Sequence, residues 1–302
     1  MLIDRNIEIQ GKKLWEVEPG PVKELQPLCR KLAAEGSVLL ENNGVLPLNK
    51  GTRVALFGRT QETYIKSGTG SGGLVRVVKA PCILDSFREN DVFSVDEELA
   101  AIYQHWIEEN PFDNGHGWAT EPWSQKEMPL DDHLITTVAQ RNDVAVIVLG
   151  RTAGEDRDNS YTDGSYCLSA DETDMINRVT SAFKETVVVL NVGNLIDLSF
   201  MDSNKVSALL YVWQGGQEGA NALADMLSGK ISPCGKLPDT QTKRADDYPY
   251  FDNFGNKDES IYEEDIYVGY RYFETFAKDK VRYPFGFGLT YTKFETDYKA
   301  VE

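Results

Sequence analysis

The chain has 302 residues, which suggests one large domain or two small ones, and it is 41% hydrophobic and 26% charged, as ordinary globular proteins are. Its 31 basic and 48 acidic residues give a net charge of -17. This charge argues against binding to nucleic acid or to an anionic membrane surface, because both recruit Lys and Arg. It fits a soluble acidic protein with a neutral substrate.

The N-terminus and the spacing of the cysteines and histidines argue against a secreted protein and against a metalloprotein. Residues 1–9 show no basic region followed by an apolar run, so we expect no secretory signal and a cytoplasmic protein. No apolar stretch approaches the roughly 20 residues of a membrane helix. The four cysteines include no CxxC pair and the three histidines show no metal-ligand spacing, which predicts free thiols and neither a metal nor another cofactor.

Apolar periodicity predicts alternating strands and helices from residue 37 to 228. Buried strands are expected at 37–41, 53–58, 144–149, 186–192 and 206–213, and helices at 21–36, 81–90, 95–109, 131–140, 170–184 and 215–227. A capping box, Ser169-Ala-Asp-Glu172, opens the helix at 170. The alternation indicates a doubly wound α/β fold with a mostly parallel sheet, interrupted by a long surface loop at 110–130.

The two ends of the chain lack this alternation. Residues 1–21 are expected to form an irregular polar arm before the domain at 22–260, whose last part, 236–260, is polar and irregular. The segment 261–292 suits a docked, partly extended linker, because it is rich in aromatic and β-branched residues. Residues 293–301 alternate as a half-buried strand does, and a strand without a partner suggests that more polypeptide follows.

A carboxylate-rich loop follows the apolar run at 144–149. Active sites of open α/β sheets lie beyond the carboxyl ends of the strands, so Glu155 is a candidate general acid/base there. Asp156 and Asp158 compete with it, and Arg157 lies between them. The alternative is a solvated charged loop without a catalytic role.

The glycine-rich run at 66–73 formally satisfies the G-x-G-x-x-G pattern of dinucleotide sites. That function needs a helix opening on the third glycine, whereas residues 74–78 suit extended structure. No GKS or GKT sequence occurs either. A flexible structural loop is therefore favoured over nucleotide binding.

Several runs, kept in order over residues 22–302, together resemble the α/β-sandwich domain of glycoside hydrolase family 3, the β-glucosidase group. They are Ala34-Glu-Gly-Ser-Val-Leu-Leu-Glu-Asn-Asn-Gly-Val-Leu-Pro-Leu48, the loop 66–73, Ala153-Gly-Glu-Asp-Arg157, Val212-Trp-Gln-Gly-Gly-Gln-Glu-Gly219, Ser232-Pro-Cys-Gly-Lys-Leu-Pro238, Tyr262-Glu-Glu-Asp-Ile-Tyr-Val-Gly-Tyr-Arg-Tyr272 and Tyr283-Pro-Phe-Gly-Phe-Gly-Leu-Thr-Tyr291. The resemblance implies an (α/β)₆-type sandwich, with residues 293–302 as the start of a fibronectin type III-like domain.

The resemblance also implies roles for two residues, and the residues themselves suggest a third. Glu155 matches the acid/base of the β-glucosidase branch, and Ser71 matches a residue that contacts the sugar. Arg157 is a substrate-binding candidate that would tune Glu155 or hold its loop, with a surface salt bridge as the alternative. The nucleophilic Asp of the family lies in a Ser-Asp-Trp motif on a (β/α)₈ barrel, and this sequence contains neither.

The resemblance therefore implies part of a retaining β-glucosidase that acts on a β-glucoside or cello-oligosaccharide and contributes to cellulose degradation. The barrel would come from the same polypeptide or from another chain, and this chain alone is expected to be inactive. A homodimer is one assembly that the resemblance allows. A β-xylosidase or β-N-acetylglucosaminidase of the same family, or a non-catalytic sugar-binding domain, remains as an alternative.

Overall fold

The computed structural model describes residues 25–74, 77, 79–155, 158–293, 295 and 297, together with two short strands of the N-terminal arm. These strands, β1 (Glu8–Ile9) and β2 (Lys12–Lys13), pair antiparallel, where an irregular arm was expected. Asp156, Arg157 and most of the terminal strand predicted at 293–301 lie outside the described residues.

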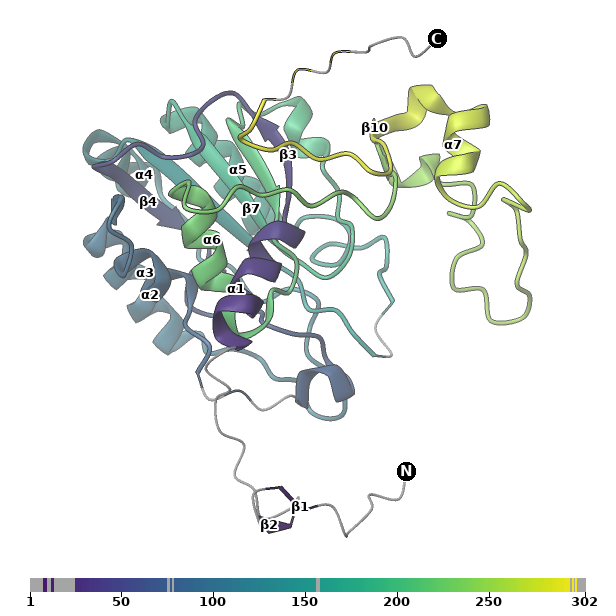
Figure 1. The fold of residues 1–302 in the computed structure, drawn as a ribbon, viewed down its shortest axis with the longest axis horizontal. Coiled ribbons are helices and arrows are strands. Elements are labelled where there is room, and N and C mark those ends of the chain that lie inside the picture. Colours follow the sequence, from purple (N-terminus) through teal and green to yellow (C-terminus); the bar gives the residue numbers. More distant parts are fainter. Residues whose placement is uncertain are drawn as a thin grey trace.

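A six-stranded sheet forms the centre of the molecule, in the order β3-β8-β7-β6-β4-β5 (Figure 1). The strands are β3 (Val38–Asn42), β4 (Thr52–Phe57), β5 (Phe93–Val95), β6 (Val144–Gly150), β7 (Thr186–Asn191) and β8 (Ala208–Tyr211). All neighbours are parallel except β3 and β8, which confirms the mostly parallel sheet. The short strand β5 was not predicted, because three residues carry too little pattern to stand out.

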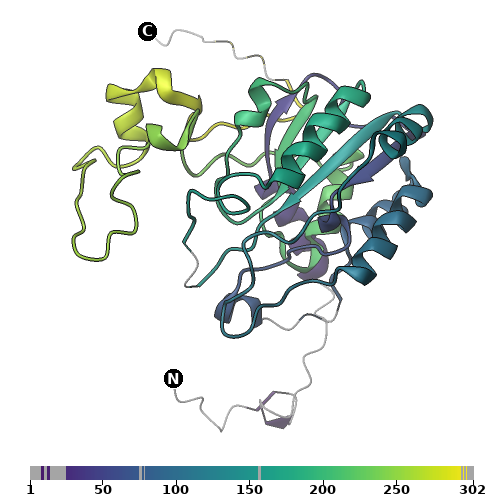
Figure 2. The same ribbon diagram turned by 180° about the vertical axis from the view of Figure 1, so that it is seen from behind.

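Helices cover both faces of this sheet, as Figures 1 and 2 show from opposite sides. They are α1 (Leu25–Gly36), α2 (Ile83–Arg88), α3 (Glu97–Glu109), α4 (Asp132–Arg141), α5 (Ala170–Ala182) and α6 (Gly219–Leu227). Successive residues of β6 alternate between two hydrophobic clusters: Ile147 packs with residues of α4 and α5, whereas Val146 and Val148 pack with residues of α2 and α6. The α/β sandwich inferred from the sequence is therefore confirmed.

Helix α1 departs from the expected packing. Its apolar side chains Leu25, Leu28 and Leu32 are 48%, 49% and 59% exposed, and among its residues only Ala34 is buried. Ala33 and Ala34 join the cluster that contains α6, and small side chains let two helices approach closely. The longer leucines consequently project away from the sheet.

The C-terminal tail forms a separate lobe beside the sheet (Figure 1). Strands β9 (Gln241–Thr242) and β10 (Val281–Tyr283) pair antiparallel at its base. The lobe contains helix α7 (Tyr270–Phe276), where the sequence favoured extended structure. Further along, the backbone N–H of Leu289 donates to the carbonyl oxygen of Leu39 at 2.7 Å, so the tail also runs along the outer edge of β3.

The end of the loop at 110–130 is buried, although a surface loop was expected. Glu127 is 5% exposed, and its carboxylate accepts hydrogen bonds from the backbone N–H groups of Arg59 (3.0 Å) and Met128 (2.8 Å). It thereby anchors the 3₁₀ turn Arg59–Gln61, through which β4 leads into the glycine-rich loop. Burial raises the pKa of Glu127 to about 7, and the nearby charge of Glu172 adds to the rise.

Glu127 is expected to make the chain less stable as the pH rises from about 4.5 to about 7. Between these values the native carboxyl keeps its proton while the unfolded one has lost it, so the free energy of unfolding falls with pH. The fall should reach up to about 3 kcal/mol. Urea unfolding at pH 5 and pH 7.5 measures it.

In the Glu127→Gln variant this part of the pH dependence should disappear. Glu108→Gln is the control, since the Glu108 side chain is 80% exposed on α3 and should leave the pH dependence as it is. Equal pH dependence in the wild type and in Glu127→Gln would contradict the assignment.

Candidate functional site

The structure brings Glu155 and Ser71 into direct contact. Glu155 follows β6 and Ser71 follows β4, and these strands are parallel neighbours, so their carboxyl ends lie at one edge of the sheet. The backbone N–H and the hydroxyl of Ser71 both donate to Oε2 of Glu155, at 2.9 Å and 2.6 Å. Both residues are exposed, so a substrate has access to them.

Glycines allow the two loops to touch. The backbone N–H of Thr69 donates to the carbonyl oxygen of Ala153 at 2.8 Å. A Cβ on Gly154 would lie 2.5 Å from that nitrogen, and a Cβ on Gly70, whose φ is +66°, would lie 2.8 Å from Cβ of Glu155. Larger residues would push the loops apart, so these glycines maintain a specific loop contact.

The same geometry bears on the dinucleotide pattern in this loop. Residues Gly70–Leu74 form a 3₁₀ turn, and no α-helix opens on Gly73. The structural context that dinucleotide binding requires is therefore missing from the described part of the loop.

The contact with Ser71 lowers the pKa of Glu155. The hydrogen bond from the Ser71 hydroxyl, and after it the one from the backbone N–H, lowers the pKa of Glu155. Both donors stabilise the carboxylate form. Glu155 in this structure is accordingly an ionised group at neutral pH.

Ser71→Ala is expected to raise the pKa of Glu155, because the variant loses the hydroxyl donor and keeps only the backbone N–H. A carbon-13 NMR titration of the side-chain carboxyl in the 302-residue chain measures this pKa. Ser181→Ala is the control, because its hydroxyl donates to the Asn177 carbonyl oxygen on α5. An unchanged pKa in Ser71→Ala would show that the hydroxyl does not govern Glu155.

A buried ion pair that the sequence analysis did not identify holds the loop carrying Glu155. Arg151 is 1% exposed and donates to both carboxylate oxygens of Glu172, at 2.5 Å and 2.7 Å. It also donates to the carbonyl oxygens of Ser165 (2.9 Å) and Cys167 (3.3 Å), at the far end of the loop. The sequence feature that could have indicated this ion pair is the position of Arg151, a single arginine directly after a buried strand.

The other predicted residues are placed only in part. Asp158 is exposed and lines a cavity of about 570 Å³ together with aromatic side chains of the tail. Arg157 and Asp156 lie outside the described residues, so the substrate-binding role of Arg157 stays a prediction.

In the described part of the chain, no group of His, Cys, Asp and Glu side chains suits a metal ion. No helix described there is long and apolar enough to span a membrane.

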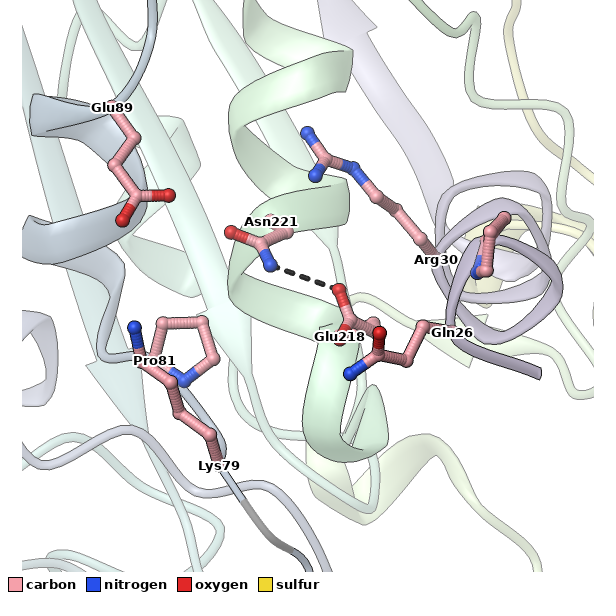
Figure 3. A pocket seen from close by; sticks show the side chains of 8 residues that line it. Gln26, Arg30, Lys79, Pro81, Glu89, Glu218 and Asn221 are labelled. Atoms are coloured by element: carbon pink, nitrogen blue, oxygen red, sulfur yellow. Dashed lines mark hydrogen bonds between the residues drawn. The ribbon is translucent and has the colours of Figure 1, made fainter. Parts of the chain in front are cut away.

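A second cavity, of about 510 Å³, contains neither Glu155 nor Ser71 (Figure 3). Its polar side chains come from several elements and include Gln26, Arg30, Lys79, Glu89, Glu218 and Asn221. Several already bind one another or close neighbours: Asn221 donates to Glu218 at 2.9 Å, and Arg30 donates to Asp225 at 2.7 Å. The Arg30–Asp225 pair joins α1 to α6, whereas the Asn221–Glu218 bond lies at the start of α6.

Comparisons with known proteins agree with this fold. The family model described as "Glycosyl hydrolase family 3 C-terminal domain" matches residues 37–291. The chain is 52% identical to a beta-glucosidase of Ruminococcus albus over 262 residues, which are 87% of this chain and 28% of that protein. It is 36% identical to beta-glucosidase A of Butyrivibrio fibrisolvens over 310 residues, covering 92% of this chain and 36% of that protein.

Solved structures give the same result. The beta-glucosidase of Paenibacillus barengoltzii superposes with a TM-score of 0.90 at 48% identity, over 94% of this chain and 31% of that one. Beta-glucosidase 3B of Thermotoga neapolitana, solved in complex with glucose, superposes with a TM-score of 0.82 at 38% identity, over 91% and 39%. The chain thus spans between 28% and 39% of the length of these relatives. It belongs to glycoside hydrolase family 3, and residues 37–291 form the C-terminal domain of that family.

Proposed function

We propose that this chain supplies the general acid/base, Glu155, of a retaining β-glucosidase that acts on terminal β-D-glucosyl residues of β-glucosides and cello-oligosaccharides. The observation that carries the proposal is an exposed carboxylate beyond β6, held by two hydrogen bonds from the neighbouring loop. The relatives' names, all beta-glucosidases, support the substrate class.

The reaction needs a second carboxylate. In retaining glycosidases the two carboxyl groups lie about 5 Å apart, one attacking the anomeric carbon and the other protonating the leaving oxygen. We propose that a (β/α)₈ barrel, in the same polypeptide or in another chain, provides the nucleophile. The greater length of the relatives leaves room for such a domain. The 302-residue chain alone is then inactive, since one carboxylate of the pair is missing.

The Ser71 contact fits the two protonation states that Glu155 must adopt. An ionised nucleophile nearby would raise the pKa of Glu155 by like-charge repulsion, so that it carries a proton when substrate binds. Formation of the glycosyl ester removes that charge. The donors of Ser71 then favour the carboxylate, which takes a proton from water in the second step.

Ser71 has a second proposed role, since its hydroxyl is exposed and is positioned beside the acid. The hydroxyl is both a donor and an acceptor, so it can contact a sugar hydroxyl while the backbone N–H keeps hold of Glu155. Arg157 is proposed to bind the substrate or to hold the loop from its place two residues after Glu155.

The leaving-group dependence of a Glu155→Gln variant tests this function in the enzyme that contains the barrel. Loss of the acid should lower kcat/KM for cellobiose about 100-fold or more, because its alkoxide leaving group needs a proton. The dinitrophenyl glucoside leaves without protonation and should keep its kcat/KM within about threefold. Glu108→Gln is the control, and equal losses with both substrates would refute the assignment.

A further inference from the structure

We propose that Thr152 is a positioning residue for the acid/base, because it ties the loop that carries Glu155 to a segment anchored before the Ser71 loop. This segment, residues 122–128, is termed the strap. The inference rests on the proposed function of Glu155. The contact between Ser71 and Glu155 is exposed, and water competes for exposed hydrogen bonds. A buried brace at the base of the two loops keeps this contact in one geometry.

The C-terminal end of the strap is anchored to the turn that follows β4. The carboxylate of Glu127 accepts a hydrogen bond from the backbone N–H of Arg59 at 3.0 Å. The guanidinium of Arg59 donates in turn to the carbonyl oxygens of Lys126, at 2.7 Å, and Asn110, at 2.9 Å. Arg59 is buried, and its charged group forms stronger hydrogen bonds than a neutral donor does. The strap is therefore fixed to the segment that leads into the Ser71 loop.

The N-terminal end of the strap holds Thr152. The backbone N–H of Thr152 donates to the carbonyl oxygen of Trp123 at 2.8 Å, and its hydroxyl donates to that of Pro122 at 2.9 Å. Thr152 is buried, so these bonds are shielded from water. The carbonyl oxygen of the next residue, Ala153, accepts from the backbone N–H of Thr69 at 2.8 Å. Thr152 thus joins the strap to the acid-bearing loop directly beside a contact between the two loops.

These contacts close a circuit around the acid/base. Along the chain, Arg59 leads to Ser71, and Thr152 leads to Glu155. Ser71 and Glu155 meet at one end of the circuit, and the strap connects Arg59 with Thr152 at the other. The strap thereby limits how far apart the two loops can lie. A misplacement of about 1 Å can cost on the order of 100-fold in rate, so this spacing matters for proton transfer.

A carbon-13 NMR titration of Glu155 in the 302-residue chain tests the positioning. Thr152→Val keeps the shape of the side chain and removes the hydroxyl donor to Pro122. The contact with Ser71 should loosen and the pKa of Glu155 should rise, because the Ser71 donors stabilise the carboxylate. Thr152→Ala loses the same donor without placing a methyl group against the carbonyl oxygen, and should give the same rise. Thr152→Ser keeps the hydroxyl and should retain the wild-type pKa.

A double variant shows whether Thr152 acts through Ser71. In a Ser71→Ala background, Thr152→Val should raise the pKa of Glu155 by less than it does in the wild type, since the hydroxyl contact is already lost. An equal rise in both backgrounds would overturn the proposal. Thr180→Val is the matched control, because Thr180 is also buried and its hydroxyl donates to the carbonyl oxygen of Ile176 within α5 at 2.7 Å. It should leave the pKa unchanged.

Kinetics of the enzyme that contains the barrel give a second measurement. Thr152→Val should lower kcat for cellobiose about tenfold and change KM by less than about twofold, because the substrate still binds while the acid is misplaced. The dinitrophenyl glucoside should keep its kcat/KM within about twofold, since its leaving group needs no proton. Thr180→Val should behave as the wild type with both substrates.

The proposal fails if the pKa of Glu155 is unchanged in both Thr152→Val and Thr152→Ala, or if it rises equally in Thr152→Ser. Unchanged turnover of cellobiose, or equal losses of kcat/KM with both substrates, would overturn it as well. The titration requires no catalysis, so it reports on the positioning of Glu155 separately from the Glu155→Gln experiment, which tests the proposed function.

Discussion

Glu155→Ala is expected to lower kcat for cellobiose by about 10²- to 10⁴-fold in the enzyme assembled with its barrel, the range that general acid/base groups contribute. Both steps become slower: formation of the glycosyl enzyme loses its proton donor, and its hydrolysis loses the base that activates water. Glu155 is exposed, and among the described residues its side chain accepts hydrogen bonds from Ser71 alone, so the fold of the 302-residue chain does not depend on it. The thermal midpoint of the variant should therefore match that of the wild type.

Sodium azide distinguishes loss of the acid/base from general damage to the site. With a dinitrophenyl glucoside the first step proceeds without an acid, and the glycosyl enzyme accumulates. Azide then attacks the anomeric carbon without needing a base and fits the space left by the side chain. The expected product is β-glucosyl azide, with the rate rising as azide is added. Full activity in Glu155→Ala, or no response to azide, would refute the role; Glu108→Ala serves as the control.

Arg151→Met is expected to destabilise the chain by about 3–5 kcal/mol, the cost of leaving one partner of a buried ion pair alone. Glu172 is 4% exposed and would be left buried without its cationic partner. The carbonyl oxygens of Ser165 and Cys167 would also lose a donor. Urea unfolding of the 302-residue chain measures the loss.

A double variant separates the ion pair from the loop contacts. In Arg151→Met with Glu172→Leu, the total loss should be smaller than the sum of the two single losses, because no isolated charge remains buried. Arg178→Met is the matched control: Arg178 pairs with Asp174 on the surface of α5 and should change stability by less than about 1 kcal/mol. Additive losses at 151 and 172 would show that the pair is not coupled.

Local patterns in the sequence were sufficient to predict the central strands of the sheet and the start of helix α5. The apolar runs that became β6 and β7 are buried along their whole length, so continuous hydrophobicity marked them well. The capping box at Ser169 and Glu172 is present with both of its hydrogen bonds, since the pattern itself contains the partners. The position of Glu155 beyond a strand followed from the same reasoning.

Features that depend on contacts between residues far apart in the sequence could not be predicted from local patterns. The antiparallel direction of β3 depends on its pairing with β8. The burial of Glu127 depends on the backbone of Arg59, which is distant in sequence. The pairing of Ser71 with Glu155 joins two loops, and only the family resemblance had singled out Ser71. A single sequence contains no direct record of such contacts.

The bridge between the tail and β3 has a consequence for how the molecule resists self-association. The carbonyl oxygen of Leu39 is occupied by Leu289, and that of Ser37 by the N–H of Gly235, so the outer edge of this strand offers few free groups. The opposite edge, β5, is only three residues long. Neither margin gives a foreign strand a template for cross-β growth. Removal of the segment around 289 would uncover the longer margin, since it would free the carbonyl oxygen of Leu39.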